Sequence, residues 1–110
     1  MAYHAVHRHA HISASKVRPL TNLIRGKRAD LALEILKYQP QRGARMLEKV
    51  LKSALGNAED QRATNLARLV VVDVRAENGP MYKRMRPRAR GMAHVIKKRL
   101  AHIRVSLDSL

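Results

Sequence analysis

The sequence predicts an α+β fold, in which about three helices pack on a short antiparallel sheet that carries a long, protruding, basic β-hairpin. In the middle of the chain, apolar residues recur at three- and four-residue spacing, as they do on the buried face of a helix. In the last third, two segments rich in β-branched residues, LVVVDV and VIKKRLAHIRVSL, flank the basic stretch MYKRMRPRARG. With 110 residues, 45% of them hydrophobic, we expect one domain, residues 1–110, with residues 79–95 forming the hairpin arm and tip.

Residues 2–12 alternate loosely and predict a strand. Its two expected sides are Val6, Ala10 and Ile12 against Tyr3, His7, His9 and His11. Three imidazoles on one face could approach a zinc ion, but alternate strand residues are roughly 6.5 Å apart, too far for one tetrahedral ion without bending. We therefore expect no metal site here, and favour imidazoles that face a polyanion beside Arg8.

A first helix is expected after this strand. Ser13 or Ser15 can cap it, because a hydroxyl accepts hydrogen bonds from the free N–H groups of a first turn. Pro19 is acceptable only within the first turn, since proline lacks the donor that later turns need. Gly26 suits the position just after the helix, where a left-handed backbone is common, so the helix is predicted to end there.

Two further helices are predicted, over residues 29–38 and from residue 42 to about 62. In the second helix Leu31, Ile35 and Leu36 are expected to share one face. In the third, the apolar residues at helical spacing are Leu47, Val50, Leu51, Ala54, Leu55 and Ala58. Charged residues lie largely opposite that face, where we expect them to be solvated.

Charge is distributed in blocks along the chain. Residues 1–29 hold six Lys or Arg and no acid, residues 30–77 hold eight basic and seven acidic residues, and residues 78–110 hold nine basic residues and one acid. The formal net charge is +15. A nearly neutral middle with two basic extensions is typical of a surface that binds a polyanion.

The composition favours phosphate contact with a folded RNA. Aromatic residues make up only 3% of the chain, which argues against a module that reads single-stranded bases by stacking. Phosphate contacts fix position and shape more than sequence. The predicted RNA-binding residues are Arg8, His9, Lys16, Arg18, Arg25, Lys27, Lys83, Arg84, Arg86, Arg88, Arg90, Lys97, Lys98 and Arg99.

Catalysis finds little support in the sequence, and we predict no enzyme and no cofactor. There is no glycine-rich phosphate loop, no His-Glu-x-x-His pair and no cysteine. Glu59 and Asp60 are adjacent, but consecutive helix residues lie about 100° apart and do not converge as an acid/base pair. A metal-free nuclease that uses histidines is a weaker hypothesis. The main rival is a histone-like DNA-bending protein, in which Pro87 would wedge into duplex DNA.

Six blocks, in order, resemble a known family: HRHAHISASKVR, LIRGK, ALEIL, NAE, GPMYKRMRPRARG and HIRVSL. They are similar to the universal large-subunit ribosomal protein number twenty-two, bacterial type, over nearly the whole chain. The residues that match its hairpin pattern are Lys83, Arg88, Ala89, Gly91, His102, Ile103, Val105 and Leu107. Met92 departs from that pattern, since a basic or polar residue usually follows the glycine.

The resemblance implies a structural role in translation. Its expected partners are large-subunit ribosomal RNA, neighbouring large-subunit proteins and the nascent peptide, with the chain a monomer within the ribosome. In this family a long β-hairpin lines the wall of the nascent-peptide exit tunnel, so the resemblance implies a tunnel tip in this chain. The residues of that tip are Arg86, Pro87, Arg88, Ala89, Arg90, Gly91 and Met92. The resemblance implies a ribosome-bound protein, and we expect it to be cytoplasmic with no membrane partner, because no run of about 18 apolar residues occurs.

Overall fold

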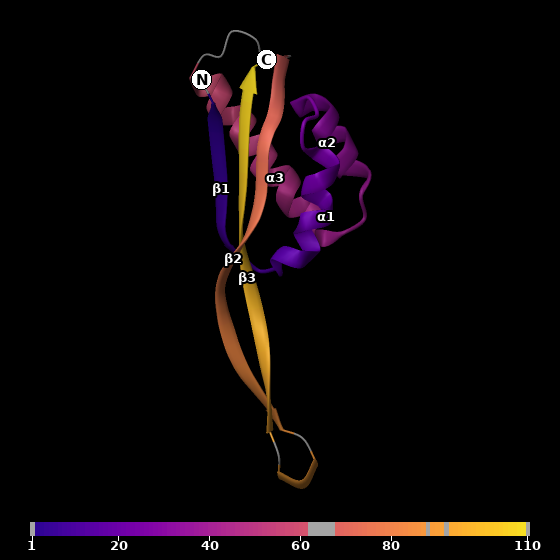
Figure 1. The fold of residues 1–110 in the computed structure, drawn as a ribbon, viewed down its shortest axis with the longest axis vertical. Coiled ribbons are helices and arrows are strands. Elements are labelled where there is room, and N and C mark those ends of the chain that lie inside the picture. Colours follow the sequence, from indigo (N-terminus) through magenta and orange to yellow (C-terminus); the bar gives the residue numbers. More distant parts are fainter. Residues whose placement is uncertain (1, 62–67, 88, 92, 110) are drawn as a thin grey trace.

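The computed structural model describes residues 2–61, 68–87, 89–91 and 93–109. The elements in chain order are β1 (Tyr3–Ala10), α1 (Ala14–Ile24), α2 (Ala29–Tyr38), α3 (Arg42–Asp60), β2 (Leu69–Pro87), the 3₁₀ turn η2 (Ala89–Gly91) and β3 (Ala93–Ser109). β3 lies between β1 and β2 in an antiparallel sheet. Figure 1 shows the helices beside the upper part of this sheet, while β2 and β3 continue downward alone. The predicted α+β class with its long hairpin is confirmed.

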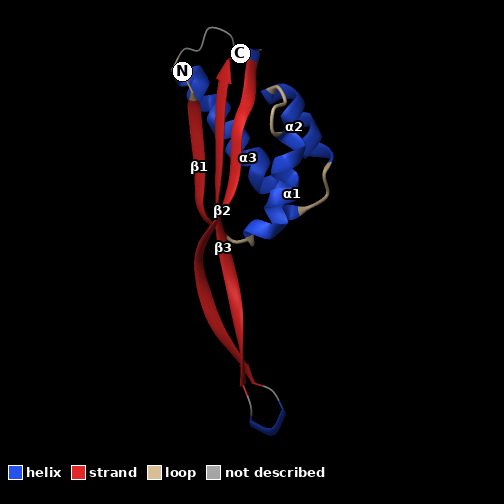
Figure 2. Cartoon of the chain, viewed as in Figure 1, coloured by secondary structure: helices blue, strands red, loops and turns tan. Residues whose placement is uncertain are grey.

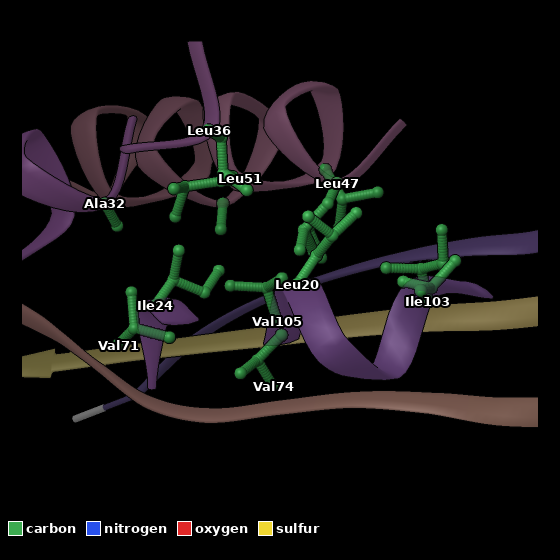
Figure 3. Close-up of a cluster of buried hydrophobic side chains, with 14 of the residues drawn as sticks. Leu20, Ile24, Ala32, Leu36, Leu47, Leu51, Val71, Val74, Ile103 and Val105 are labelled. Atoms are coloured by element: carbon green, nitrogen blue, oxygen red, sulfur yellow. The ribbon is translucent and has the colours of Figure 1, made fainter. Parts of the chain in front are cut away.

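The hydrophobic core lies between the sheet and the three helices. On β3, Ala101, Ile103, Val105 and Leu107 are fully buried, because alternate residues of a strand face the same side. The helices supply residues at three- and four-residue spacing. Figure 3 shows side chains of this cluster, among them Leu20, Ile24, Ala32, Leu36, Leu47, Leu51, Val71, Val74, Ile103 and Val105. We call the part of the molecule that shares this core the body.

α1 starts and ends as predicted but accommodates its proline differently. Ser13 precedes the helix in an extended conformation, although its hydroxyl contacts the Ser15 hydroxyl at 3.2 Å and caps no backbone N–H. The prediction that Pro19 lies in the first turn is wrong, because α1 begins at Ala14 and Pro19 lies inside it. Proline leaves the Ser15 carbonyl without its helical donor. Ser15 is exposed, so water can hydrogen-bond that carbonyl.

Gly26 ends the first helical segment as predicted. Its φ is +82°, a left-handed conformation that glycine adopts without steric cost. Its N–H donates to the Val71 carbonyl at 2.8 Å, and the Val71 N–H donates to the Lys27 carbonyl at 2.9 Å. The turn after α1 is therefore tied to β2.

α2 spans the predicted residues 29–38, and α3 begins at Arg42 as predicted and is described to Asp60. The buried face of α3 includes the predicted leucines and alanines, except that Leu55 is half-buried. The predicted face of α2 is partly wrong, because Leu31 is 43% exposed and the buried residues are Ala29, Ala32 and Leu36. Two alanines on that face allow α2 to lie close to the rest of the body.

The predicted sides of β1 are also partly wrong. Ala5 is buried and Val6 is 41% exposed, which reverses the expected orientation of the first half of the strand. The register with β3 shifts between His7 and Ala10, and His9 has a φ of +58°. An extra residue in one strand changes which side chains face the core. The bulge therefore returns Ala10 to the buried side.

β2 and β3 stay paired far beyond the body, from Leu69 opposite Ser109 to Pro87 opposite Ala93. We call residues 79–99 the arm, and the place where it leaves the helices the neck. Figure 2 shows the arm as two strands with the short helical turn at its far end. The molecule measures 65 × 25 × 16 Å, so the arm makes it much longer than it is wide. None of the described helices is long and apolar enough to cross a membrane.

Candidate nucleic-acid interface

The arm presents its cations to solvent. Residues 81–87 are all exposed, as are Lys97, Lys98 and Arg99. Lys83 pairs with Lys97 directly across the two strands. Like charges in that position repel each other and destabilise a ribbon in water. The arm is thus a surface that an anion would stabilise.

The tip of the arm turns through two consecutive left-handed residues. Arg90 has a φ of +62° and Gly91 a φ of +69°. Among the other predicted tip residues, Arg86 and Pro87 are exposed at the end of β2, and Ala89 begins η2. Arg88 and Met92 lie outside the described residues. The sequence predicts a turn at Pro87 and Gly91, but the left-handed conformation of an arginine has no sequence signal.

Apolar side chains accompany the cations along the arm. Met81 and Tyr82 are each 46% exposed and Met85 is 71% exposed. The guanidinium of Arg84 lies 5.3 Å from the centre of the Tyr82 ring, within the range of a cation–π contact. Met85 in particular is too exposed to serve as packing between the strands. These side chains are available to a partner surface.

A cleft of about 960 Å³ opens at the neck, between the arm and the starts of two helices. It is lined by His11, Ile12, Ser13, Lys16, Gln41, Arg42, Gly43, Tyr82, Arg84, Lys97, Lys98, Arg99 and Leu100. The predicted residues Lys16, Arg84, Lys97, Lys98 and Arg99 therefore meet at one place, although they are distant in sequence. Arg42 joins them without having been predicted, and His11, one of the imidazoles expected to face a polyanion, joins them too. The available signal for Arg42 was a cation in a first helical turn that contains no acid.

The predicted N-terminal contacts lie at the bulge of β1. Arg8 and His9 are exposed. The His9 N–H donates to Nδ1 of His102 at 3.1 Å, and the two rings lie 5.2 Å apart between centres. His102 also lies against Gly79, where an added Cβ would be 3.3 Å from the imidazole. These contacts join β1 and β2 to β3 at the neck, and the sequence did not reveal them.

The predicted cations around α1 have different environments. Arg18 is exposed, and so is Lys27. Arg25 donates to Asn22 Oδ1 at 2.8 Å and to the Val74 carbonyl at 2.7 Å. The bond to Val74 joins the end of α1 to β2, the bond to Asn22 stays within the α1 segment, and three of the five guanidinium donors remain for a partner. Arg25 combines a structural contact with an exposed side chain.

The described carboxylates with ion-pair partners lie in the body. Glu48 lies 3.3 Å from Arg45 and 3.2 Å from Lys52, and Asp73 lies 3.1 Å from Arg75. Arg45 also donates to the carbonyls of Leu36, Lys37 and Gln39 at the end of α2. We expected Arg45 to be simply solvated, but it caps a helix end, where a cation is favoured.

The described residues offer no metal centre. In the part of the chain that the structure describes, no group of three or more His, Cys, Asp or Glu side chains could hold a metal ion. His7, His9 and His11 form no such group, and the register of β1 shifts between His7 and Ala10. A compact body with an exposed basic arm offers a surface that suits an anionic partner.

Comparison with known proteins identifies the class more closely. The profile of the family described as ribosomal protein L22p/L17e matches residues 5–108. A large ribosomal subunit protein uL22 from Rhodopirellula baltica is 59% identical, with 98% of this chain and 95% of that protein aligned. Proteins of the same name from Caldicellulosiruptor saccharolyticus and Finegoldia magna are 51% and 46% identical, over 91% and 94% of this chain and 82% and 93% of their own lengths.

The chain belongs to the ribosomal protein L22p/L17e family, which confirms the resemblance found in the sequence. It is a protein of the large ribosomal subunit and not an enzyme, since the family is structural. The ribosome-bound, cytoplasmic location predicted from the sequence follows from the family as well. The DNA-bending and nuclease hypotheses lose their support.

Proposed function

We propose that this chain binds large-subunit ribosomal RNA through phosphate contacts, stabilises the folded RNA, and places its arm in the wall of the nascent-peptide exit tunnel. The observation that carries the proposal is the exposed positive charge of the arm, whose sequence contains no acidic residue. Residues 78–107 contain nine Lys or Arg and no carboxylate, and the described cations of the arm are exposed. A two-stranded ribbon is marginally stable in water, so anionic surroundings would stabilise this one.

The residues proposed to contact RNA form two groups. The arm contributes Lys83, Arg84, Arg86, Arg88, Arg90, Lys97, Lys98 and Arg99, and the body contributes Arg8, His9, Lys16, Arg18, Arg25 and Lys27. The two groups would act as one domain and as a monomer within the ribosome, with neighbouring ribosomal proteins around the body. If eight to ten phosphates are neutralised, the binding constant should fall as roughly the seventh to ninth power of salt concentration.

Sedimentation of the native protein from a cell lysate tests this assignment. We expect co-migration with the large ribosomal subunit through a sucrose gradient, persistence after a high-salt wash, and loss after ribonuclease treatment. Migration with the nucleoid, or as a free dimer, would instead restore the DNA-bending hypothesis. A salt slope near −2 for binding to the isolated RNA would contradict extensive phosphate contact.

Placement of the tip in the tunnel needs a separate test. The chain contains no cysteine, so Arg90→Cys supplies a single site for a short photo-crosslinker. In ribosomes stalled with a radiolabelled nascent chain, we expect a crosslink from position 90 to that chain. Ser53→Cys, on the exposed surface of α3, serves as the control and should give none. Equal crosslinking from both positions would remove the support for the tunnel.

A further inference from the structure

We infer that the cleft at the neck binds a segment of the RNA sugar–phosphate backbone, which is held between the body and the arm and sets the direction of the arm. The inference rests on the proposed RNA binding, and goes beyond it by assigning one site where two parts of the protein share one ligand. The cleft lies where the last described buried residues of the hairpin give way to exposed ones, at Leu100.

Positive charge accumulates in this cleft from both sides. Lys16 and Arg42 line it from the body, and Arg84, Lys97, Lys98 and Arg99 line it from the arm. No carboxylate is among the described residues that line it. Within the described ranges, none of these cations has an ion-pair partner, since the ion pairs join Glu48 to Arg45 and Lys52, and Asp73 to Arg75.

Facing cations make the cleft unfavourable when it is empty of anions. A concave surface lined by charge of one sign concentrates the field and attracts counter-ions. A phosphate between the two groups of cations would replace repulsion across the neck by attraction to a common ligand. The same RNA segment would then hold the arm against the body, which a contact with only one of them could not do.

The shape and backbone of the cleft suit a chain of phosphates. A volume of about 960 Å³ is at the upper end of the range for small-ligand sites and leaves room for several nucleotide units. The first turns of α1 and α3 also line it, contain no acid, and are not capped by side chains. Their N–H groups add donors for phosphate oxygens beside the cations.

The arm side of the cleft has a defined face. Tyr82 lies opposite Lys98 in the strand register, and alternation places Arg84 on the same face. Arg84 already lies over the Tyr82 ring at 5.3 Å. Arg84 and Lys98 thus lie on the same face as the Tyr82 ring. An RNA sugar or base edge can lie next to that ring.

A charge-neutralised variant tests the site. Lys16→Gln, Arg42→Gln and Lys98→Gln together remove one cleft-lining cation from each of α1, α3 and β3. The matched control, Lys37→Gln, Lys49→Gln and Lys52→Gln, removes three exposed helical cations elsewhere, so both variants lower the net charge of +15 by three. Binding to isolated large-subunit ribosomal RNA is measured across a salt titration. We expect the cleft variant to reduce the salt slope by about two to three, and the control to reduce it by less than one.

A second measurement locates the RNA directly and does not depend on the triple variant folding. Ser13→Cys places an iron chelate in the cleft, and Ser53→Cys places it on α3 away from the cleft. We expect hydroxyl radicals from position 13 to cut one continuous RNA segment more strongly than those from position 53. In a footprint, the wild-type chain should protect that RNA segment from cleavage, and the Lys98→Gln variant should not protect it.

The outcomes separate this inference from the proposed function. If the wild-type chain assembles into large subunits but the cleft and control variants bind RNA alike, the cleft inference is overturned and RNA binding stands. Absence of strong cutting from position 13 would overturn it too. If the wild-type chain does not bind the RNA at all, the proposed function itself fails.

Discussion

The body and the arm are built on the same two strands, yet they are stabilised in different ways. In the body, alternate residues of β3 from Ala101 to Leu107 are fully buried beneath the helices. In the arm, every residue from Met81 to Pro87 is exposed, although the antiparallel pairing continues. Regular backbone pairing therefore says little about what stabilises a ribbon. The body has its own apolar core, whereas the arm has cations whose natural complement is an anion.

Charge shows the same contrast. In the body, Glu48 lies between Arg45 and Lys52, and Asp73 lies beside Arg75. In the arm the sequence contains no carboxylate that could take this role. Part of the charge of the body is therefore balanced by ion pairs within it. The arm would be balanced only by a partner such as the RNA proposed above.

The largest effect on stability is expected in the core of the body. Leu51 is fully buried at the contact of α3 with the other elements. Leu51→Ala removes buried methyl groups and leaves a cavity, which should lower the free energy of unfolding by about 2–5 kcal/mol. Chemical denaturation monitored by circular dichroism measures the change.

A matched substitution in the arm shows whether the contrast is real. Met85→Ala also shortens a large apolar side chain, but Met85 is 71% exposed. Its effect should stay within about 0.5 kcal/mol. A loss comparable to that of Leu51→Ala would mean that the arm shares in the folded core, against the distinction drawn here.

A smaller effect is expected from the helix cap supplied by Arg45. Its guanidinium donates to carbonyls at the end of α2 and lies 3.3 Å from Glu48. Arg45→Ala should cost about 1–2 kcal/mol, because charge-assisted hydrogen bonds are lost but the side chain is 49% exposed and partly screened. Lys49→Ala, at an exposed position of the same helix, is the control and should change stability by no more than about 0.5 kcal/mol. If Arg45→Ala and Lys49→Ala lowered the free energy of unfolding equally, Arg45 would have no capping role.

Much of the fold could be predicted because its signals are local. The periodicity of residues 42–60, the positive φ at Gly26 and the β-branched segments of the hairpin each follow from neighbouring residues. The errors arose where tertiary structure overrides such signals. The bulge at His9 reverses the sides of β1, and α1 tolerates Pro19 because the affected turn is exposed.

The sequence predicts which segment carries the cations of the candidate site, but it does not predict where in the fold they meet. A block of cations without acids identifies the arm from the sequence alone. The meeting of Lys16, Arg42 and Lys98 in one cleft depends on how two helices and the hairpin come together. The bonds from His9 to His102 and from Arg45 to the end of α2 likewise join residues from different elements. The spacing of apolar and charged residues along the chain does not predict contacts between different elements.

The smallest effect on stability, and a large one on RNA binding, is expected when cations of the arm outside the cleft are neutralised. Lys83, Arg86 and Arg90 are exposed, and Lys83 lies opposite Lys97. The combined variant Lys83→Gln, Arg86→Gln and Arg90→Gln removes repulsion and no buried contact. Its free energy of unfolding should therefore stay within about 0.5 kcal/mol of the wild type.

Binding to large-subunit ribosomal RNA should weaken, although folding is expected to be nearly unaffected. If each of the three side chains contacts a phosphate, the salt slope should fall by about two to three. The control Lys37→Gln, Lys49→Gln and Lys52→Gln should leave the slope nearly unchanged, since its exposed cations lie on α2 and α3. An arm variant that unfolds the body, or one that binds RNA as the control does, would contradict the separation of the arm's charges from the stability of the core. Unchanged stability with a reduced slope would show that these arm cations contribute to RNA affinity and not to folding.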